Sequence, residues 1–131
     1  MNIVIIGTGY VGLVTGAGLA HLGHDVTCTD LDQGKIDRLR AGEIPIYEPG
    51  LPELVAETTA QGRLSFTTEP AAALAQADAA FLCVGTPRGP EDGHADLSQV
   101  LAAARDVARA ARPGMVLATK STVPVGTGDM L

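Results

Sequence analysis

The sequence has few aromatic and few basic side chains. Phe, Trp and Tyr make up 3% of its 131 residues, and tryptophan is absent. Nine Lys and Arg stand against 15 Asp and Glu, which gives a formal net charge of -6. Nucleic acid is therefore excluded as a main partner, because it requires clustered positive charge and often aromatic platforms for its bases. A phosphorylated small molecule remains open, because backbone amides bind phosphate without basic side chains.

Long apolar runs and a disulfide framework are also missing. No apolar stretch reaches the roughly 18 residues of a membrane span, and the N-terminus is unlike a signal peptide, so we expect no membrane partner. The two cysteines, Cys28 and Cys83, do not suggest disulfides, and we expect a cytoplasmic protein. His21, His24 and His94 lack the spacing of metal ligands, so no metal site is expected.

Short apolar runs alternate with longer Ala- and Leu-rich stretches of helical period. Strands are predicted over Asn2–Ile6, Asp25–Thr29, Leu64–Thr67, Ala79–Val84 and Met115–Thr119. Helices are predicted over Tyr10–Leu22, Gly34–Arg40, Glu53–Gln61, Pro70–Gln76 and Leu97–Ala111, and 121–131 is irregular or begins another helix. This alternation predicts an α/β fold: a Rossmann-like doubly wound parallel sheet of order 3-2-1-4-5 with helices on both faces.

Packing and loop expectations follow from the same pattern. The helical period predicts that the buried face of the first helix contains Val11, Val14, Leu19 and Leu22. Gly16 and Gly18 are expected to allow close packing of this helix, and Gly23 is expected to end it. Loops are expected over 43–52 and 85–95. In the second loop, a solvated segment is favoured over a cation site for Glu91, Asp92 and Asp96.

Three glycines form the pattern G-x-G-x-x-G between the first predicted strand and the first predicted helix: Gly7, Gly9 and Gly12. The pattern alone is weak, but this position is the context of a dinucleotide-binding loop. There Gly7 permits the tight turn, Gly9 lets the backbone approach a pyrophosphate, and Gly12 lets the helix pack on the strand. The amides and partial positive charge of the helix N-terminus then attract phosphate. The alternative is a tight turn without a ligand.

Asp30 completes this fingerprint at the end of the second predicted strand, 18 residues after Gly12. A distance of about 20 residues is typical of the acid that binds the adenosine ribose hydroxyls. A carboxylate there repels a 2′-phosphate, so NAD is favoured over NADP. Asp32 is the better helix cap, which leaves Asp30 free for the ribose. The alternative for Asp30 is an ordinary capping or turn aspartate.

Four stretches carry a more specific signal: Gly7–Gly12, Ile44–Leu51, Cys83–Pro87 and Lys120–Thr127. Together with their spacing, they resemble the N-terminal domain of the UDP-glucose/GDP-mannose dehydrogenase family across the whole chain. Within the family, Lys120–Pro124 and residues 92–98 are similar to the UDP-glucose branch. The GDP-mannose branch usually has Arg at position 120 and Leu between its Val and Pro.

The resemblance implies that Val11 lies against the pyrophosphate, that Asp30 binds ribose and that Lys35 reaches the adenosine side. For Lys35 a solvated helix face is the alternative. The implied NAD-binding residues are Gly7, Gly9, Tyr10, Val11, Gly12, Asp30, Lys35, Gly85, Thr86, Pro87, Ser121 and Thr122. No chemistry is assigned to Glu48, which lies in a loop typical of the family.

Three of these residues lie at the ends of the last two predicted strands, where such sheets bind ligands. Thr86, Ser121 and Thr122 would contact the cofactor there, and simple turn residues are the alternative for the first two. Thr122 would also be an auxiliary catalytic residue that helps to hold a water near the reacting carbon.

The family oxidises the C6 alcohol of a nucleotide sugar to a carboxylate with two NAD molecules. It uses a cysteine, a lysine and an aspartate in motifs that this chain does not contain. We therefore expect residues 1–131 to be an incomplete NAD-binding domain that ends before its last helix and strand. The UDP-sugar-binding domains would lie outside this chain, and the whole enzyme would be a homodimer. This segment would bind NAD without turnover. The alternatives are a GDP-mannose or other UDP-sugar dehydrogenase, or a stand-alone NAD-binding module.

Overall fold

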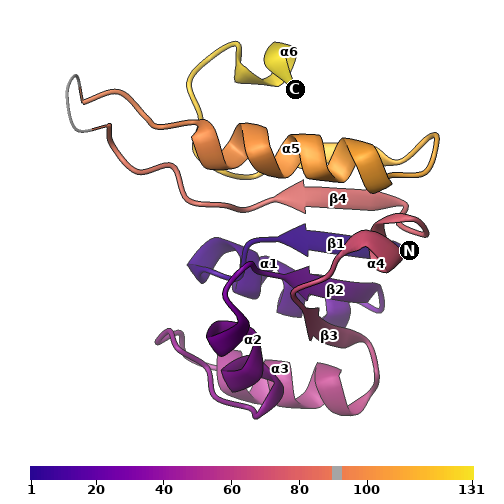
Figure 1. Ribbon diagram of the computed structural model, residues 1–131. Helices are drawn as coiled ribbons and strands as arrows, with labels where there is room; N and C mark the ends of the chain where they lie inside the picture. Colours follow the sequence, from indigo (N-terminus) through magenta and orange to yellow (C-terminus); the bar gives the residue numbers. More distant parts are fainter. Residues whose placement is uncertain (90–92) are drawn as a thin grey trace.

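A parallel five-stranded sheet organises residues 1–89 and 93–131, which are the residues that the computed structural model describes. Its order is β3-β2-β1-β4-β5, which confirms the predicted Rossmann-like topology. Figure 1 shows the first four of these strands side by side. The strands are β1 (Asn2–Ile6), β2 (Asp25–Thr29), β3 (Leu64–Thr67), β4 (Ala79–Leu82) and β5 (Val116–Thr119). The helices are α1 (Tyr10–His21), α2 (Gln33–Arg40), α3 (Leu51–Ala60), α4 (Ala71–Leu74), α5 (Ser98–Ala110) and α6 (Thr127–Met130). Glu91 and Asp92, which belong to the predicted solvated segment, lie outside the described residues.

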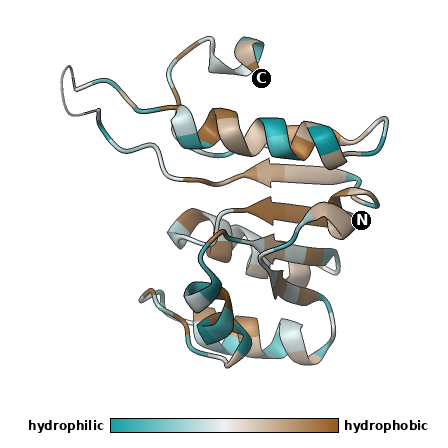
Figure 2. Cartoon of the chain, in the orientation of Figure 1, coloured by the Kyte–Doolittle hydropathy of each residue, from teal (hydrophilic) through white to brown (hydrophobic). Residues whose placement is uncertain are grey.

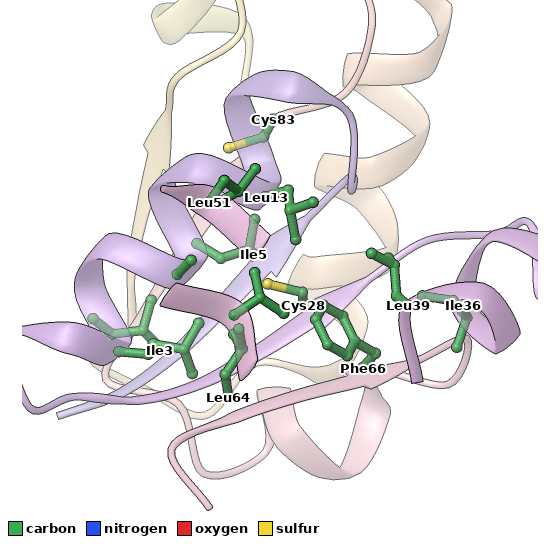
Figure 3. Close-up of a cluster of buried hydrophobic side chains, with 14 residues drawn as sticks. Ile3, Ile5, Leu13, Cys28, Ile36, Leu39, Leu51, Leu64, Phe66 and Cys83 are labelled. Carbon is green, nitrogen blue, oxygen red and sulfur yellow. The ribbon is translucent and has the colours of Figure 1, made fainter. Parts of the chain in front are cut away.

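The central strand β1 is apolar because both faces of the sheet are covered. Alternate side chains of a strand point to opposite faces. Ile3 and Ile5 therefore join the core beneath α1, α2 and α3, shown in Figure 3, whereas Val4 joins the core beneath α4 and α5. In Figure 2, the arrow of β1 is mostly apolar, while α5 alternates between polar and apolar residues. Because all four strand pairings are parallel, the carboxyl ends of the five strands lie at one edge of the sheet.

The buried face of α1 differs from the predicted face. The buried residues are Gly12, Leu13, Gly16, Ala17 and Ala20. Val11 and Leu22 are 41% and 74% exposed, and Val14 and Leu19 are only partly buried. Small residues face the sheet because the helix lies very close to it: a Cβ on Gly16 would lie 2.5 Å from Cys28 Sγ. The expectation for Gly16 is confirmed, whereas that for Gly18 is wrong, because a Cβ there would meet open space.

The element ends follow local backbone chemistry. Gly23 ends α1 with a positive φ of 101°, as predicted. The α3 helix begins at Leu51, two residues before the predicted start, and Pro52 occupies its first turn. Proline is favoured there because the first-turn amides have no partner within the helix. Several elements are shorter than predicted: β4 ends at Leu82, α4 covers only Ala71–Leu74, and α1, α5 and β5 lack one or two of their predicted terminal residues.

Cys28 and Cys83 are free and buried, which confirms the prediction that they do not form a disulfide. Burial raises the pKa of the Cys28 thiol, and it raises that of Cys83 to about 11 despite the opposing effect of Lys120. Both side chains therefore remain thiols at neutral pH and act as small apolar core groups. Within residues 1–89 and 93–131, no helix is long and apolar enough to span a membrane.

Candidate cofactor-binding site

A cleft of about 950 Å³ opens at the carboxyl ends of the strands. It lies where the chain order of the sheet reverses, between β1 and β4, which is the position where doubly wound sheets bind ligands. The predicted site residues that line it are Gly7, Gly9, Tyr10, Val11, Asp30, Lys35, Gly85, Thr86, Ser121 and Thr122. Gly12 and Pro87 are the two predicted residues that do not line it. The fold thus brings together ten residues from four separate segments.

The three glycines of the loop serve different purposes. Gly7 has a φ of 105°, and a Cβ on it would lie 2.7 Å from the Cys83 carbonyl oxygen. A Cβ on Gly12 would lie 1.8 Å from the Gly7 carbonyl oxygen, so this glycine acts through packing and lies beneath the cleft. Gly9 has an ordinary φ of -71°, and a Cβ on it would meet no heavy atom within 4 Å. Among the described residues, neither backbone strain nor packing requires a glycine at position 9, and the space beside it is open.

The N-terminus of α1 is open toward the cleft. Gly9 is its N-cap, no side chain caps it, and its first turn contains no acidic residue. The first-turn amides therefore have no competing carboxylate, and the helix dipole places partial positive charge at this end. This arrangement suits an anionic group such as a pyrophosphate.

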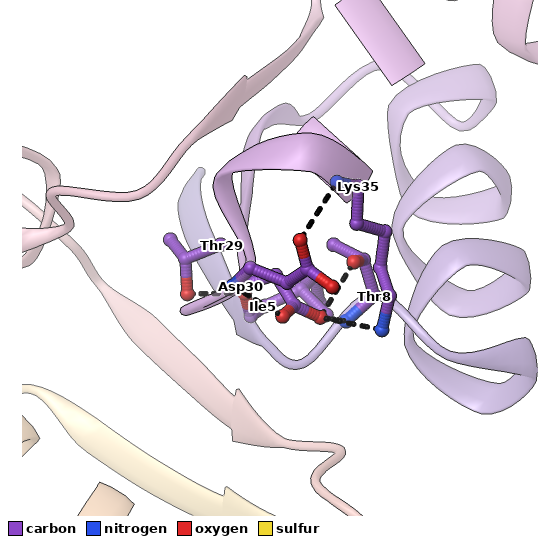
Figure 4. Close-up of polar contacts among 6 residues, drawn as sticks. Ile5, Thr8, Thr29, Asp30 and Lys35 are labelled. Atoms are coloured by element: carbon purple, nitrogen blue, oxygen red, sulfur yellow. Dashed lines mark hydrogen bonds and ion pairs between the residues drawn. The ribbon is translucent and has the colours of Figure 1, made fainter. Parts of the chain in front are cut away.

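Asp30 lies beside this loop and is held by four donors, most of which Figure 4 shows. Its Oδ2 accepts hydrogen bonds from the Thr8 hydroxyl at 2.7 Å, the Thr8 amide at 3.1 Å and Lys35 Nζ at 3.2 Å. Its Oδ1 accepts one hydrogen bond, from the Asp32 amide at 3.0 Å. Because each carboxylate oxygen offers two lone pairs, Oδ1 retains room for another donor.

These contacts change the expected picture of Asp30 in one respect. Asp32 does cap α2, as predicted, through its side chain and the Lys35 amide. Asp30 is nevertheless not free, because the loop and α2 fix its carboxylate before any ligand binds. Partial burial raises the pKa of Asp30, but the hydrogen bonds from Asp32, Thr8 and Lys35 outweigh burial and hold that pKa below its ordinary value. A fixed, ionised acceptor is what recognition of ribose hydroxyls requires.

Lys35 lies within the cleft rather than on a solvated helix face. Its side chain is 31% exposed, and its ammonium pairs with Asp30, whose side chain is 15% exposed. Lys35 is therefore a partly buried, paired side chain that lines the cleft, and its predicted role toward the adenosine side stays a prediction.

The β4 and β5 side of the cleft is joined by hydroxyl groups. Ser121 Oγ donates to the Val84 carbonyl at 2.7 Å, and Thr86 Oγ1 donates to the Thr122 carbonyl at 2.9 Å. Each hydroxyl has used its proton to hold the two segments together, so each faces a ligand as an acceptor only. Ser121 and Thr86 thus join the segments that follow β4 and β5, and both residues also line the cleft.

Sequence reasoning missed several residues of the cleft. Thr8 is a variable position of the glycine pattern and only 1% exposed, yet it makes two of the four hydrogen bonds to Asp30. Thr8 lies near Asp30 because β1 pairs with β2, and such a pairing gives no recognisable residue spacing in the sequence. The α5 side of the cleft contains Ser98, Gln99, Ala102 and Ala103. Ser98 ends the stretch 92–98 that resembles the UDP-glucose branch, whereas the other three belong to no motif.

Comparison with known proteins agrees with this geometry. The model of the UDP-glucose/GDP-mannose dehydrogenase family, NAD binding domain, matches residues 1–131. The chain belongs to this family. Membership of this NAD-binding domain family supports NAD as the cofactor.

Individual relatives of the family extend the comparison. The chain is 57% identical over 129 residues to a UDP-glucose 6-dehydrogenase of Rhizobium meliloti, covering 98% of this chain and 30% of that protein. It is 55% identical over 131 residues to the UDP-glucose 6-dehydrogenase YwqF of Bacillus subtilis, covering 100% and 30%. The chain thus spans about 30% of the length of these curated relatives.

A solved structure of GDP-mannose dehydrogenase from Pseudomonas aeruginosa, a ternary complex, superposes with a TM-score of 0.92 at 38% identity. That match covers 98% of this chain and 30% of the other. A UDP-glucose dehydrogenase from Pyrobaculum islandicum gives a TM-score of 0.89 at 47% identity, covering 95% and 29%.

Proposed function

We propose that this chain supplies the NAD site of an enzyme that oxidises UDP-glucose at C6 to the carboxylate, UDP-glucuronate. The observation that carries the proposal is the ionised Asp30 carboxylate held by Thr8 and Lys35 at the end of β2, beside the open N-terminus of α1. A fixed carboxylate there accepts hydrogen bonds from the ribose hydroxyls of NAD, and its negative charge repels the 2′-phosphate of NADP.

Each part of the cleft then has a role. The amides after Gly9 bind the pyrophosphate, Val11 packs against it, and Asp30 with Lys35 holds the adenosine ribose. The segments of Gly85–Pro87 and Ser121–Thr122 flank the rest of the cofactor, with Thr122 as an auxiliary catalytic residue. NAD accepts the hydride removed from C6 in each of two successive steps.

The groups that perform the chemistry are expected outside residues 1–131, together with the domains that bind the UDP-sugar. Both cysteines of this chain are buried thiols of raised pKa, so neither suits a covalent step. UDP-glucose is favoured because two relatives at 55% and 57% identity are UDP-glucose 6-dehydrogenases. GDP-mannose is the second candidate, supported by the TM-score of 0.92. We further propose a cytoplasmic homodimer for the whole enzyme, which the free cysteines and the family resemblance support.

Thermal unfolding of the 131-residue chain with NAD, with NADP and without either nucleotide tests the cofactor part. NAD at 100 times its dissociation constant stabilises the folded state by about 2.7 kcal/mol, and the melting temperature rises accordingly. NADP at the same concentration is expected to have little effect. An equal shift with NADP would contradict the role of Asp30. Turnover of UDP-glucose but not GDP-mannose by the longer protein tests the substrate.

A further inference from the structure

A hydrogen bond joins the glycine loop to the loop before α3. The hydroxyl of Tyr10 donates to Glu48 Oε2 at 2.6 Å, across 38 positions of sequence. Tyr10 is the first residue of α1 and lines the cleft, whereas Glu48 does not line it. Glu48 can therefore affect a ligand of the cleft through Tyr10.

Glu48 is a fixed partner because its own loop is anchored in the core. Its carbonyl accepts a hydrogen bond from the Leu51 amide at 3.1 Å. Leu51 is 3% exposed and packs in the same cluster as Leu13 of α1. The turn that carries Glu48 is thus tied to the helix that carries Tyr10, and the distance between the two side chains is set by buried packing.

Tyr10 needs such a partner because packing alone does not hold it. The residue is 52% exposed, and a side chain at that exposure keeps several rotamers unless a bond selects one. The phenol donates its only proton to the carboxylate, which places the ring at the edge of the cleft. Ordering the ring in advance removes an entropy cost that a ligand would otherwise bear on binding.

We infer that Glu48 is a positioning residue for NAD: through its bond to Tyr10, it holds the aromatic ring against the cofactor in the cleft. This inference rests on the proposed NAD site. It assigns a role to a residue whose type and position in a proline-rich loop give no indication of one.

A double-mutant cycle on the 131-residue chain tests the inference, with the NAD dissociation constant measured by calorimetry. Tyr10→Phe and Glu48→Ala each remove the hydrogen bond. Each is therefore expected to raise the NAD dissociation constant about two- to tenfold, because the side chain at position 10 must then be ordered on binding. The double variant is expected to be no weaker than either single variant. Glu48→Gln keeps an acceptor oxygen without the charge, so it should stay within about twofold of the unaltered chain.

Matched controls and a second readout separate positioning from damage to the fold. Tyr47→Phe makes the same chemical change on a residue that is 91% exposed, and it should leave the dissociation constant unchanged. In that background Tyr10 is the sole tyrosine of a chain without tryptophan. The bond to Glu48 and its charge raise the pKa of Tyr10, so tyrosinate absorbance should appear at higher pH than after Glu48→Ala.

The outcomes distinguish the two proposals. Failure of the unaltered chain to bind NAD would overturn both. Binding of NAD that Glu48→Ala leaves unchanged, or additive losses in the double variant, would overturn the positioning role alone.

Discussion

The two sides of the cleft differ in how fully the chain builds them. On the β1–β2 side, Thr8 is 1% exposed and Asp30 accepts four hydrogen bonds before any ligand is present. On the β4–β5 side, β5 is less covered: Val116, at the end of β5 away from the cleft, is 61% exposed, and the rest of the strand is only partly buried. The first side therefore has a carboxylate held by four donors, whereas the second is joined by the β4–β5 backbone ladder and the hydroxyls of Ser121 and Thr86.

Position in the sheet explains this difference. β1 pairs with β2 and β4, so its side chains are covered and its backbone is paired on both edges. In the described residues β5 pairs with β4 alone. A strand with one neighbour loses packing on one edge, and its substitutions cost correspondingly less. Substitutions on the first side should thus be the more damaging ones.

The largest effect is expected from Gly12→Ala. The added Cβ would lie 1.8 Å from the Gly7 carbonyl oxygen, so backbone must move, at a cost of about 3 kcal/mol or more. We expect the melting temperature to fall by roughly 10 °C, measured by circular dichroism.

Gly9→Ala is the matched control for Gly12→Ala, because its Cβ meets nothing within 4 Å. It should keep most of the stability and lose most of the affinity for NAD, because the methyl group enters the space proposed for the pyrophosphate. If Gly9→Ala bound NAD normally, the glycine loop would be a structural turn only.

Gly9 and Gly12 also show how much of the fold and of the site the sequence could predict. The glycine spacing predicts the loop because three backbone constraints occur at fixed positions. Apolar runs predict the strands, and their alternation with helices predicts the doubly wound strand order. The buried face of α1 was predicted wrongly because hydrophobicity favours Val11 over Gly16, whereas close packing on β2 requires the smaller residue. The role of Thr8 depends on the distance between two chain segments, which no local pattern encodes.

Asp30→Asn should have the next largest effect, and it should weaken both folding and NAD binding, because an NH2 donor replaces one of the oxygens that accept from Thr8, Asp32 and Lys35. The variant keeps the shape of the side chain but loses the charge, and hydrogen bonds to charged groups contribute about 1.5–3 kcal/mol. We expect about tenfold weaker NAD binding or more, and a smaller difference between NAD and NADP, measured by calorimetry. Asp32→Asn is the control, because Asn caps a helix as well as Asp. An equal loss in Asp32→Asn would assign the effect to α2 rather than to the ribose.

A smaller effect is expected from Ser121→Ala on the β4–β5 side. The substitution removes the hydroxyl that donates to the Val84 and Leu82 carbonyls at 2.7 and 3.2 Å. One such hydrogen bond contributes about 1 kcal/mol, so urea unfolding should show a loss of that order. Ser65→Ala, at an exposed position of β3, should cost less than half as much. A loss of several kcal/mol in Ser121→Ala would mean that the two sides of the cleft are equally rigid.

The smallest effect is expected from Val116→Thr, which exchanges a methyl group for a hydroxyl without changing shape. At 61% exposure the hydroxyl remains in contact with water, so the free energy of unfolding should change by less than about 0.5 kcal/mol. The same exchange in β2, Val26→Thr, places a hydroxyl at a position that is 2% exposed and should cost about 1–3 kcal/mol. Urea unfolding of the two variants measures the contrast directly, because the chemistry is identical and only the covering of the strand differs. Equal costs would show that β5 is covered in solution as fully as β2, and the contrast between the two sides would then rest on the hydrogen bonds of Asp30 alone.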